Sequence, residues 1–193
     1  MTPEDRALDP SLLLDKSPII LYRLARARFA NLSGIGAALT PGRWNAPGQE
    51  AIYTSTEAGV PLLERLVHTP KDLIPSNLAL MKFRLTGSWD DGFIDPDASF
   101  NGLIDPKTRG SFWFYSTLAA ARDPSGGLHE MYSVLRRIEL EPLAMAVPSV
   151  IVPVWNVVLY PGAPAFWNHV HLESIEPFEF DPRLFPEEAQ RET

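Results

Sequence analysis

The sequence contains no cysteine among its 193 residues. This absence excludes disulfide bonds, cysteine nucleophiles and zinc sites that use thiolate ligands. It also fits a reducing compartment, so we expect a cytoplasmic protein. Long hydrophobic runs are missing as well, because no stretch approaches the roughly 20 apolar residues that cross a membrane. The first residues lack the basic start and apolar run of a secretion signal, and we expect no membrane partner.

Positive charge is scarce, with 17 basic against 24 acidic residues and a formal net charge of −7. This balance argues against direct binding of nucleic-acid backbones, although a local basic pocket could still hold a small anion. Hydrophobic residues make up 45% of the chain, which is enough for one core. We expect an N-terminal arm over residues 1–17, a single domain over 18–185 and a tail over 186–193. The sequence leaves open whether the chain forms a homo-oligomer.

Short runs rich in β-branched and aromatic residues predict strands. They cover residues 19–24, 51–53, 78–85, 143–153, 155–161 and 169–180. Apolar residues at helical spacing predict a helix over 60–67, a second over 111–122 beneath the sheet, and a helical or mixed segment over 128–140. Residues 87–110 form a long loop, of the kind that compact domains keep for function. The irregular alternation of strands and helices favours an α+β fold over a doubly wound sheet.

The stretch over residues 42–68 places three reactive polar groups among core-forming residues. Arg43 lies in its loop, Tyr53 in its strand and Glu64 in its helix. Because apolar residues recur at helical spacing between Val60 and Val67, the Glu64 carboxylate borders buried surface and needs a partner or a purpose.

The plain structural alternative is a salt bridge between Arg43 and Glu64, a packed Tyr53, and a Ser149 that only forms a turn. Residue statistics favour this alternative when sequence spacing is the only guide. Arg23, which projects from the first predicted strand, is a further candidate for contacting a ligand.

Two familiar loop motifs are incomplete in this chain. Residues 34–36 read Gly-Ile-Gly, but Leu39 occupies the third glycine position of a dinucleotide-binding loop and no strand immediately precedes it. Residues 95–99 begin like a calcium-binding loop, yet Phe100 replaces the required glycine and Pro106 the bidentate acid. We therefore expect neither a Rossmann nucleotide site nor a calcium site.

Two histidines near the C-terminus are the remaining metal candidates. His169, His171 and Glu173 would share one face of a strand and could ligate a metal, but such a face is more often simply solvated. His68, at the end of a predicted helix, is a favourable partner for the helix dipole. We expect no metal.

Two separated motifs carry a resemblance to a known family. Residues 42–68, GRWNAPGQEAIYTSTEAGVPLLERLVH, resemble the opening signature of the RES-domain family, which is named for an arginine, a glutamate and a serine. Residues 147–161, VPSVIVPVWNVVLYP, resemble its second signature. With YRL at 22–24 and FDPRLF at 180–185, the resemblance covers about residues 19–185.

The resemblance implies a fold similar to that of ADP-ribosyltransferases, with two small β-sheets flanking an NAD cleft and helices around them. It implies a toxin of a toxin–antitoxin pair that consumes NAD+ by splitting off nicotinamide, through hydrolysis or through phosphorolysis with inorganic phosphate. The partner would be a small helical, DNA-binding antitoxin of the Xre-like kind. Carried over by position, the named trio becomes Arg43, Glu64 and Ser149, with Tyr53 and Arg23 as further NAD-binding residues.

Two alternatives stay open at this stage, a protein ADP-ribosyltransferase and a catalytically silent nucleotide-binding module. The chain also departs from the family pattern. Where the family commonly reads NLLNPAHPDF, this chain reads NVVLYPGAPAF, so Tyr160 takes the place of an asparagine and Ala163 that of a histidine. These changes bear on substrate access and partner contacts but leave the trio intact.

Overall fold

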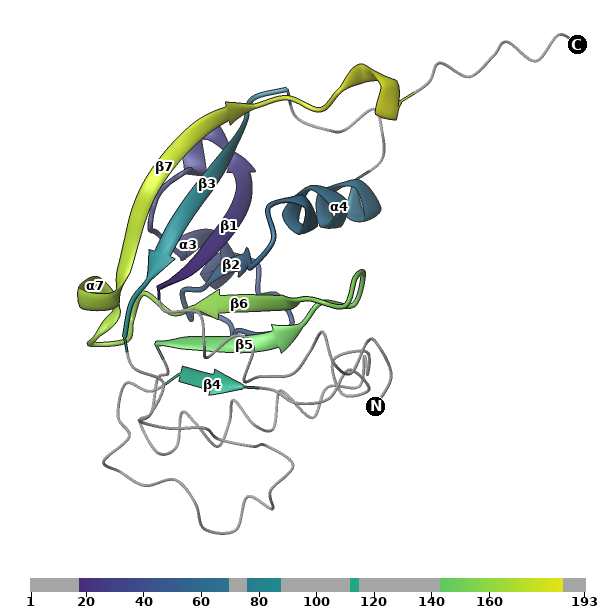
Figure 1. The fold of residues 1–193 in the computed structure, drawn as a ribbon. Coiled ribbons are helices and arrows are strands. Elements are labelled where there is room, and N and C mark those ends of the chain that lie inside the picture. Colours follow the sequence, from purple (N-terminus) through teal and green to yellow (C-terminus); the bar gives the residue numbers. More distant parts are fainter. Residues whose placement is uncertain (1–17, 70–75, 88–111, 115–142, 186–193) are drawn as a thin grey trace, which may run out of the picture.

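The structure, a computed structural model, describes residues 18–69, 76–87, 112–114 and 143–185, which contain seven strands and a few short helices (Figure 1). The strands are β1 (Ile19–Arg26), β2 (Ile52–Ser55), β3 (Leu78–Leu85), β4 (Phe112–Phe114), β5 (Ala144–Pro148), β6 (Trp155–Leu159) and β7 (Val170–Phe178). The helices are η1 (Ala27–Phe29), α3 (Ile35–Leu39), α4 (Gly59–His68), α7 (Phe166–His169) and η5 (Pro182–Leu184).

All seven strands belong to one hydrogen-bonded sheet in the order β4-β5-β6-β2-β1-β3-β7. Every neighbouring pair is antiparallel except β4 and β5, which are parallel. β1 pairs with β3 over its full length, whereas β1 and β2 share a single pair, Tyr22 with Ser55. The sheet therefore has two halves, β7-β3-β1 and β2-β6-β5-β4, and we call their junction at Tyr22 and Ser55 the seam. Figure 1 shows the two halves running in different directions from it.

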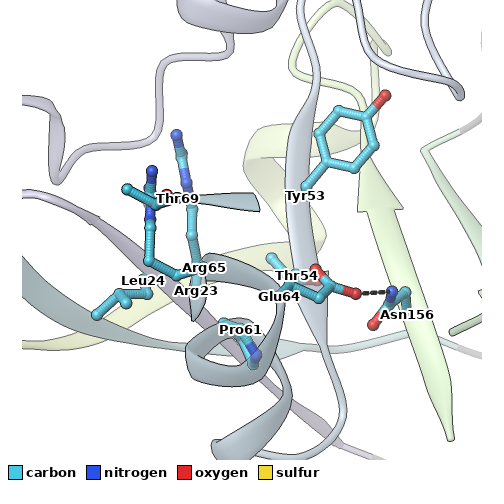
Figure 2. A pocket seen from close by; sticks show the side chains of 9 residues that line it. All are labelled: Arg23, Leu24, Tyr53, Thr54, Pro61, Glu64, Arg65, Thr69 and Asn156. Atoms are coloured by element: carbon cyan, nitrogen blue, oxygen red, sulfur yellow. Dashed lines mark hydrogen bonds between the residues drawn. The ribbon is translucent and has the colours of Figure 1, made fainter. Parts of the chain in front are cut away.

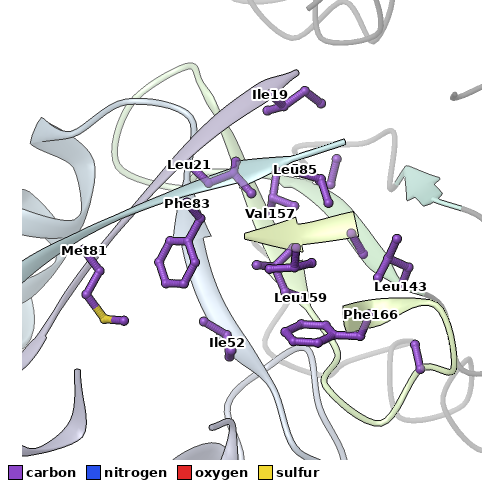
Figure 3. Close-up of a cluster of buried hydrophobic side chains, with 14 of the residues drawn as sticks. Ile19, Leu21, Ile52, Met81, Phe83, Leu85, Leu143, Val157, Leu159 and Phe166 are labelled. Atoms are coloured by element: carbon purple, nitrogen blue, oxygen red, sulfur yellow. The ribbon is translucent and has the colours of Figure 1, made fainter. Parts of the chain in front are cut away.

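One hydrophobic core joins the two halves (Figure 3). Alternating residues of β1 and β3 contribute to it because side chains two apart in a strand lie on the same face. The short β2 and β6 contribute in the same way, and Phe166 of α7 packs against them. The largest fully buried members are Ile19, Leu21, Ile52, Met81, Phe83, Leu85, Leu143, Leu159 and Phe166.

Helix α4 packs against β1 and β2, beside the seam. Pro61 lies in its first turn, where the missing N–H removes no intrahelical bond. Val60 is 3% exposed and anchors the helix, whereas Leu63 and Val67 are exposed. No helix among the described residues is long and apolar enough to span a membrane.

The α+β class and most predicted elements are confirmed. The strand predicted over 78–85 matches β3 residue for residue, and the helix predicted over 60–67 is α4. The two expected sheets occur as two halves of a single sheet, joined at the seam.

One prediction was wrong. A helix was expected over 111–122, but residues 112–114 form β4, which pairs with β5. Aromatic residues favour strands, and pairing with a distant strand prevailed over the local helical pattern. The rest of that helix, the segment over 128–140, nearly all of the 87–110 loop, the N-terminal arm and the C-terminal tail lie outside the described residues.

Candidate functional site

A pocket of about 310 Å³ lies at the seam, where β1, β2 and β6 meet α4 (Figure 2). Since a single residue pair joins β1 to β2, the strands diverge there and leave room between them. The residues lining the pocket are Arg23, Leu24, Tyr53, Thr54, Pro61, Glu64, Arg65, Thr69 and Asn156. Three of the five residues predicted from the sequence, Arg23, Tyr53 and Glu64, are thus brought together.

Glu64 enters the pocket from α4. It follows the buried Val60 by one helical turn, so both residues lie on the side of the helix that faces the sheet. Its Oε1 accepts a hydrogen bond of 2.7 Å from Nδ2 of Asn156 on β6. Within the described part of the chain no ion pair joins Arg43 to Glu64, which rules out that salt bridge as the structural explanation for the carboxylate.

Two arginines give the pocket positive charge. Arg23 continues the inward-facing series of Ile19 and Leu21 on β1, which explains why a cation is enclosed. Burial, with a smaller contribution from the charge of Arg65, lowers the pKa of the Arg23 guanidinium from its ordinary value. Its Nη1 is buried and has no hydrogen-bond partner among the described residues. A buried, unpaired donor of this kind is suited to an anionic ligand.

Tyr53 fixes the loop that precedes β2. Its hydroxyl accepts a 3.0 Å hydrogen bond from the Trp44 backbone N–H and donates a 2.9 Å bond to Oδ1 of Asn45. The buried Asn45 holds the loop from inside, because its Nδ2 donates to backbone carbonyls such as that of Ala37 and its Oδ1 also accepts from Gly42. A Cβ atom at Gly42 would collide with the Tyr53 hydroxyl, so the loop requires glycine there.

Burial raises the pKa of Tyr53 to about 12, while the hydrogen bond to Trp44 and the charge of Arg43 act in the lowering direction. The hydroxyl is therefore protonated in the folded protein at neutral pH. Because the folded pKa lies above the ordinary 10.0, stability from this group is complete below pH 10.0 and is lost as pH rises through about 12.

Replacing Tyr53 by phenylalanine should lower the free energy of unfolding by about 1–3 kcal/mol, because the Trp44 N–H and the Asn45 side chain both lose a partner. Urea unfolding measures this change. An unchanged unfolding midpoint would contradict the role of the hydroxyl in holding the loop.

The two other predicted residues lie outside the set that lines the pocket. Arg43 is exposed on the loop beside Tyr53, close enough for its charge to act on the tyrosine hydroxyl. Ser149 is 2% exposed and follows β5, where its Oγ accepts a 3.3 Å hydrogen bond from the Ile151 N–H. The catalytic roles of Arg43 and Ser149 stay predictions.

The two departures from the family pattern also lie outside the pocket lining. Tyr160 is fully buried, and its hydroxyl donates a 2.7 Å hydrogen bond to the carbonyl oxygen of Trp44. Ala163 is 2% exposed and donates its N–H to the carbonyl of Tyr160. Tyr160 thus supports the Arg43-bearing loop from the core.

Of the three candidate metal ligands His169, His171 and Glu173, the glutamate is engaged in ion pairs. The carboxylate of Glu173 forms ion pairs of 3.0 Å with both Lys82 and Arg84 of β3, and these cations lower its pKa. In the ranges that the structure describes, no cluster of three potential ligands forms. The side chain of His68 lies outside the described atoms.

Four polar residues of the pocket were not predicted from the sequence, namely Thr54, Arg65, Thr69 and Asn156. Arg65 directly follows Glu64 in the sequence. An arginine next to the candidate acid could have indicated a further charged residue of the pocket. Asn156 lies within the second family signature, but its partner Glu64 is 92 residues away in the sequence, so spacing could not reveal the contact.

Comparison with known proteins gives consistent results. Residues 20–181 match the family described as RES domain. The chain is 31% identical over 169 residues to Toxin Res of Photorhabdus laumondii, covering 86% of this chain and 97% of that protein. It is 25% identical over 161 residues to the Prs ADP-ribosylating toxin of a Sphingobium species, covering 80% and 86%.

A solved structure shares the fold. It is a chain of the MbcT–MbcA toxin–antitoxin complex of M. tuberculosis, with a TM-score of 0.54 and 20% sequence identity. The match covers 92% of this chain and 96% of that one.

Proposed function

Because this chain belongs to the RES-domain family, we propose that it cleaves the bond between nicotinamide and ribose in NAD+. The observation that carries the proposal is the pocket at the seam, in which one carboxylate, two guanidinium groups and an aromatic ring face a common space. These are the groups that a dinucleotide with a cationic leaving group requires.

One carboxylate suffices for this reaction. Nicotinamide leaves from a positively charged nitrogen, so it needs no proton donor of the kind that ordinary glycosides require. Glu64 is held by Asn156 at the pocket wall and stabilises the positive charge that develops on the ribose ring. This interaction is stronger in the transition state than in the ground state, which is the condition for raising the rate.

The arginines bind the pyrophosphate. A planar guanidinium makes paired hydrogen bonds to phosphate oxygens, and the unpartnered Nη1 of Arg23 is a ready donor. Arg65 adds a second positive charge in the same pocket. Tyr53 offers its ring for stacking with nicotinamide. This local charge explains how a protein with a net charge of −7 can bind an anion.

Arg43 contacts the phosphates from the neighbouring loop, and Ser149 supplies a hydroxyl that orders the region beside β6.

Replacing Arg43 by alanine should raise the KM for NAD+ by about tenfold and leave kcat largely unchanged, because binding in the ground and transition states weakens equally. Arg26→Ala, at an exposed position on β1, is the control. An unchanged NAD+ affinity in Arg43→Ala would reject the phosphate contact.

The biological role we propose is that of a cytoplasmic toxin kept inactive by a helical, Xre-like antitoxin. Support comes from the relatives named as toxins and from the shared fold with a chain of a toxin–antitoxin complex. Expression of the chain alone should arrest growth and deplete cellular NAD+, and co-expression of a cognate helical antitoxin should restore both. Growth arrest without NAD+ loss would contradict the proposed substrate.

A second candidate function is transfer of ADP-ribose to a protein, favoured by the similarity to a protein named as an ADP-ribosylating toxin. Incubation with NAD+ labelled in the adenosine moiety separates the two reactions. Free ADP-ribose, or its 1″-phosphate when inorganic phosphate is supplied, supports cleavage. Label retained on a protein band supports transfer. Binding of NAD+ without turnover would make the chain a nucleotide-binding module instead.

A further inference from the structure

Asn156 of β6 is the one residue that holds the Glu64 carboxylate by a hydrogen bond within the described part of the chain, at 2.7 Å from Nδ2 to Oε1. Its place is set by the sheet, because Asn156 is paired with Ser55 on one side and with Val147 on the other. A strand paired on both sides cannot shift easily, so the amide group is a fixed support for a side chain that comes from a helix (Figure 2).

The other end of the same amide is unused. Oδ1 of Asn156 is buried and has no hydrogen-bond partner among the described residues. Leaving a buried acceptor unpaired costs free energy, and such groups are rare in folded proteins. Since Asn156 lines the pocket, a ligand donor group would satisfy this oxygen. Arg23, on the facing wall, has the complementary deficiency, a buried donor without an acceptor.

We infer that Asn156 is a further residue of the site, whose amide nitrogen positions Glu64 and whose amide oxygen accepts a hydrogen bond from a hydroxyl of the ribose that carries the leaving group. The inference rests on the proposed cleavage of NAD+. The two orphaned atoms then receive opposite ends of one ligand, a phosphate oxygen at Arg23 and a ribose hydroxyl at Asn156.

Two substitutions at position 156 separate the roles of the two amide atoms. Asn156→Asp keeps an acceptor for the ribose but replaces the donor to Glu64 by a second carboxylate. Asn156→Leu removes both groups while keeping a similar size. Asn168→Asp makes the same chemical change as the first variant at an exposed position on α7, away from the pocket, and serves as the control.

The measurement is steady-state NAD+ cleavage from about pH 5 to pH 8, with each variant compared with the wild type at the same pH. In Asn156→Asp we expect KM within about threefold of the wild-type value and kcat lowered at least about tenfold at pH 8, recovering as pH falls. Recovery follows because two adjacent carboxylates share a proton at lower pH, and the protonated group again donates a hydrogen bond.

The pH response can be assigned to the pair because the ionisable side chains around it do not change protonation state in this range. Those that face the pair across the pocket are Arg23 on β1, Tyr53 on β2 and Arg65 on α4. Tyr53, with its pKa raised to about 12, stays neutral over this range, and guanidinium groups as a class do not titrate in it.

For Asn156→Leu we expect kcat to fall about tenfold to a hundredfold and KM to rise, at every pH. Equal, pH-independent losses in both variants would reduce Asn156 to a structural residue and overturn the inference. Wild-type kinetics in either variant would also overturn it. A folded wild-type protein that consumes no NAD+ would instead overturn the proposed function, and the inference with it.

Discussion

Replacing Glu64 by glutamine should lower the rate of NAD+ cleavage at least about a hundredfold, because a group aimed at developing charge in a transition state typically contributes that much. Glutamine has the same shape and keeps an oxygen that can accept from Asn156, so the helix and the pocket should stay in place. The effect should therefore fall on kcat and leave the affinity for NAD+ within about threefold. Both quantities can be measured from initial rates of nicotinamide release, in samples quenched at successive times and over a range of NAD+ concentrations.

Glu57→Gln is a matched control for this experiment. Glu57 is exposed just before α4 and does not line the pocket, so its replacement removes the same charge from the same region without touching the site. A purified Glu64→Gln variant with the wild-type melting temperature and the wild-type rate would refute the assignment of Glu64. A Glu57→Gln variant with the same loss would show that net charge near the helix, and not the carboxylate in the pocket, governs the rate.

Replacing Arg23 by methionine should weaken NAD+ binding and stabilise the empty protein at the same time. The substitution removes a charge-assisted contact to phosphate, which should raise the dissociation constant by about tenfold to a hundredfold. It also removes a buried donor that has no partner among the described residues, so the free energy of unfolding without ligand should rise by about 1 kcal/mol. For a chain of this size that gain corresponds to roughly 2–4 °C in Tm.

The two opposite changes distinguish a ligand-binding arginine from a structural one. Thermal unfolding with and without NAD+ measures both, because a ligand that binds only the folded state raises Tm and the variant should lose that increase. Arg26→Met, at the exposed end of the same strand, should leave both quantities unchanged. A lower Tm for Arg23→Met without ligand would mean that the guanidinium stabilises the fold, and it would contradict the assignment of Arg23 as an NAD+-binding residue.

Local pattern predicted the elements well where burial alternates regularly along a strand. β3 is the clearest case, since buried and partly exposed residues alternate over most of its length between two neighbouring strands. Local pattern predicted the wrong element at residues 112–114, because alanines farther along the chain favoured a helix. The strand that pairs with these residues, β5, begins about 30 residues later in the sequence. Pairing between distant segments is not encoded in local spacing.

The candidate site shows the same limit. The sequence indicated that the Glu64 carboxylate needed a partner, and the family resemblance identified Glu64 as a site residue. The partner found in the structure is Asn156, and its position depends on the register between β2 and β6. Arg43 and Glu64 were close enough in sequence to suggest a salt bridge, whereas in the fold Arg43 is exposed on the loop beside Tyr53 and does not line the pocket that contains Glu64. The sequence could therefore predict which residue types the site contains, but only the three-dimensional fold shows which of them contact one another.

The width of the pocket depends on the single residue pair, Tyr22 with Ser55, that joins β1 to β2. Backbone hydrogen bonds fix the spacing of strands wherever ladders are continuous, but here they hold the two halves at one point only. The angle between the halves is then governed by the volume of the side chains wedged between them, such as Leu21, Ile52 and Val157. Core substitutions that change this volume would therefore open or narrow the pocket without altering any residue that lines it.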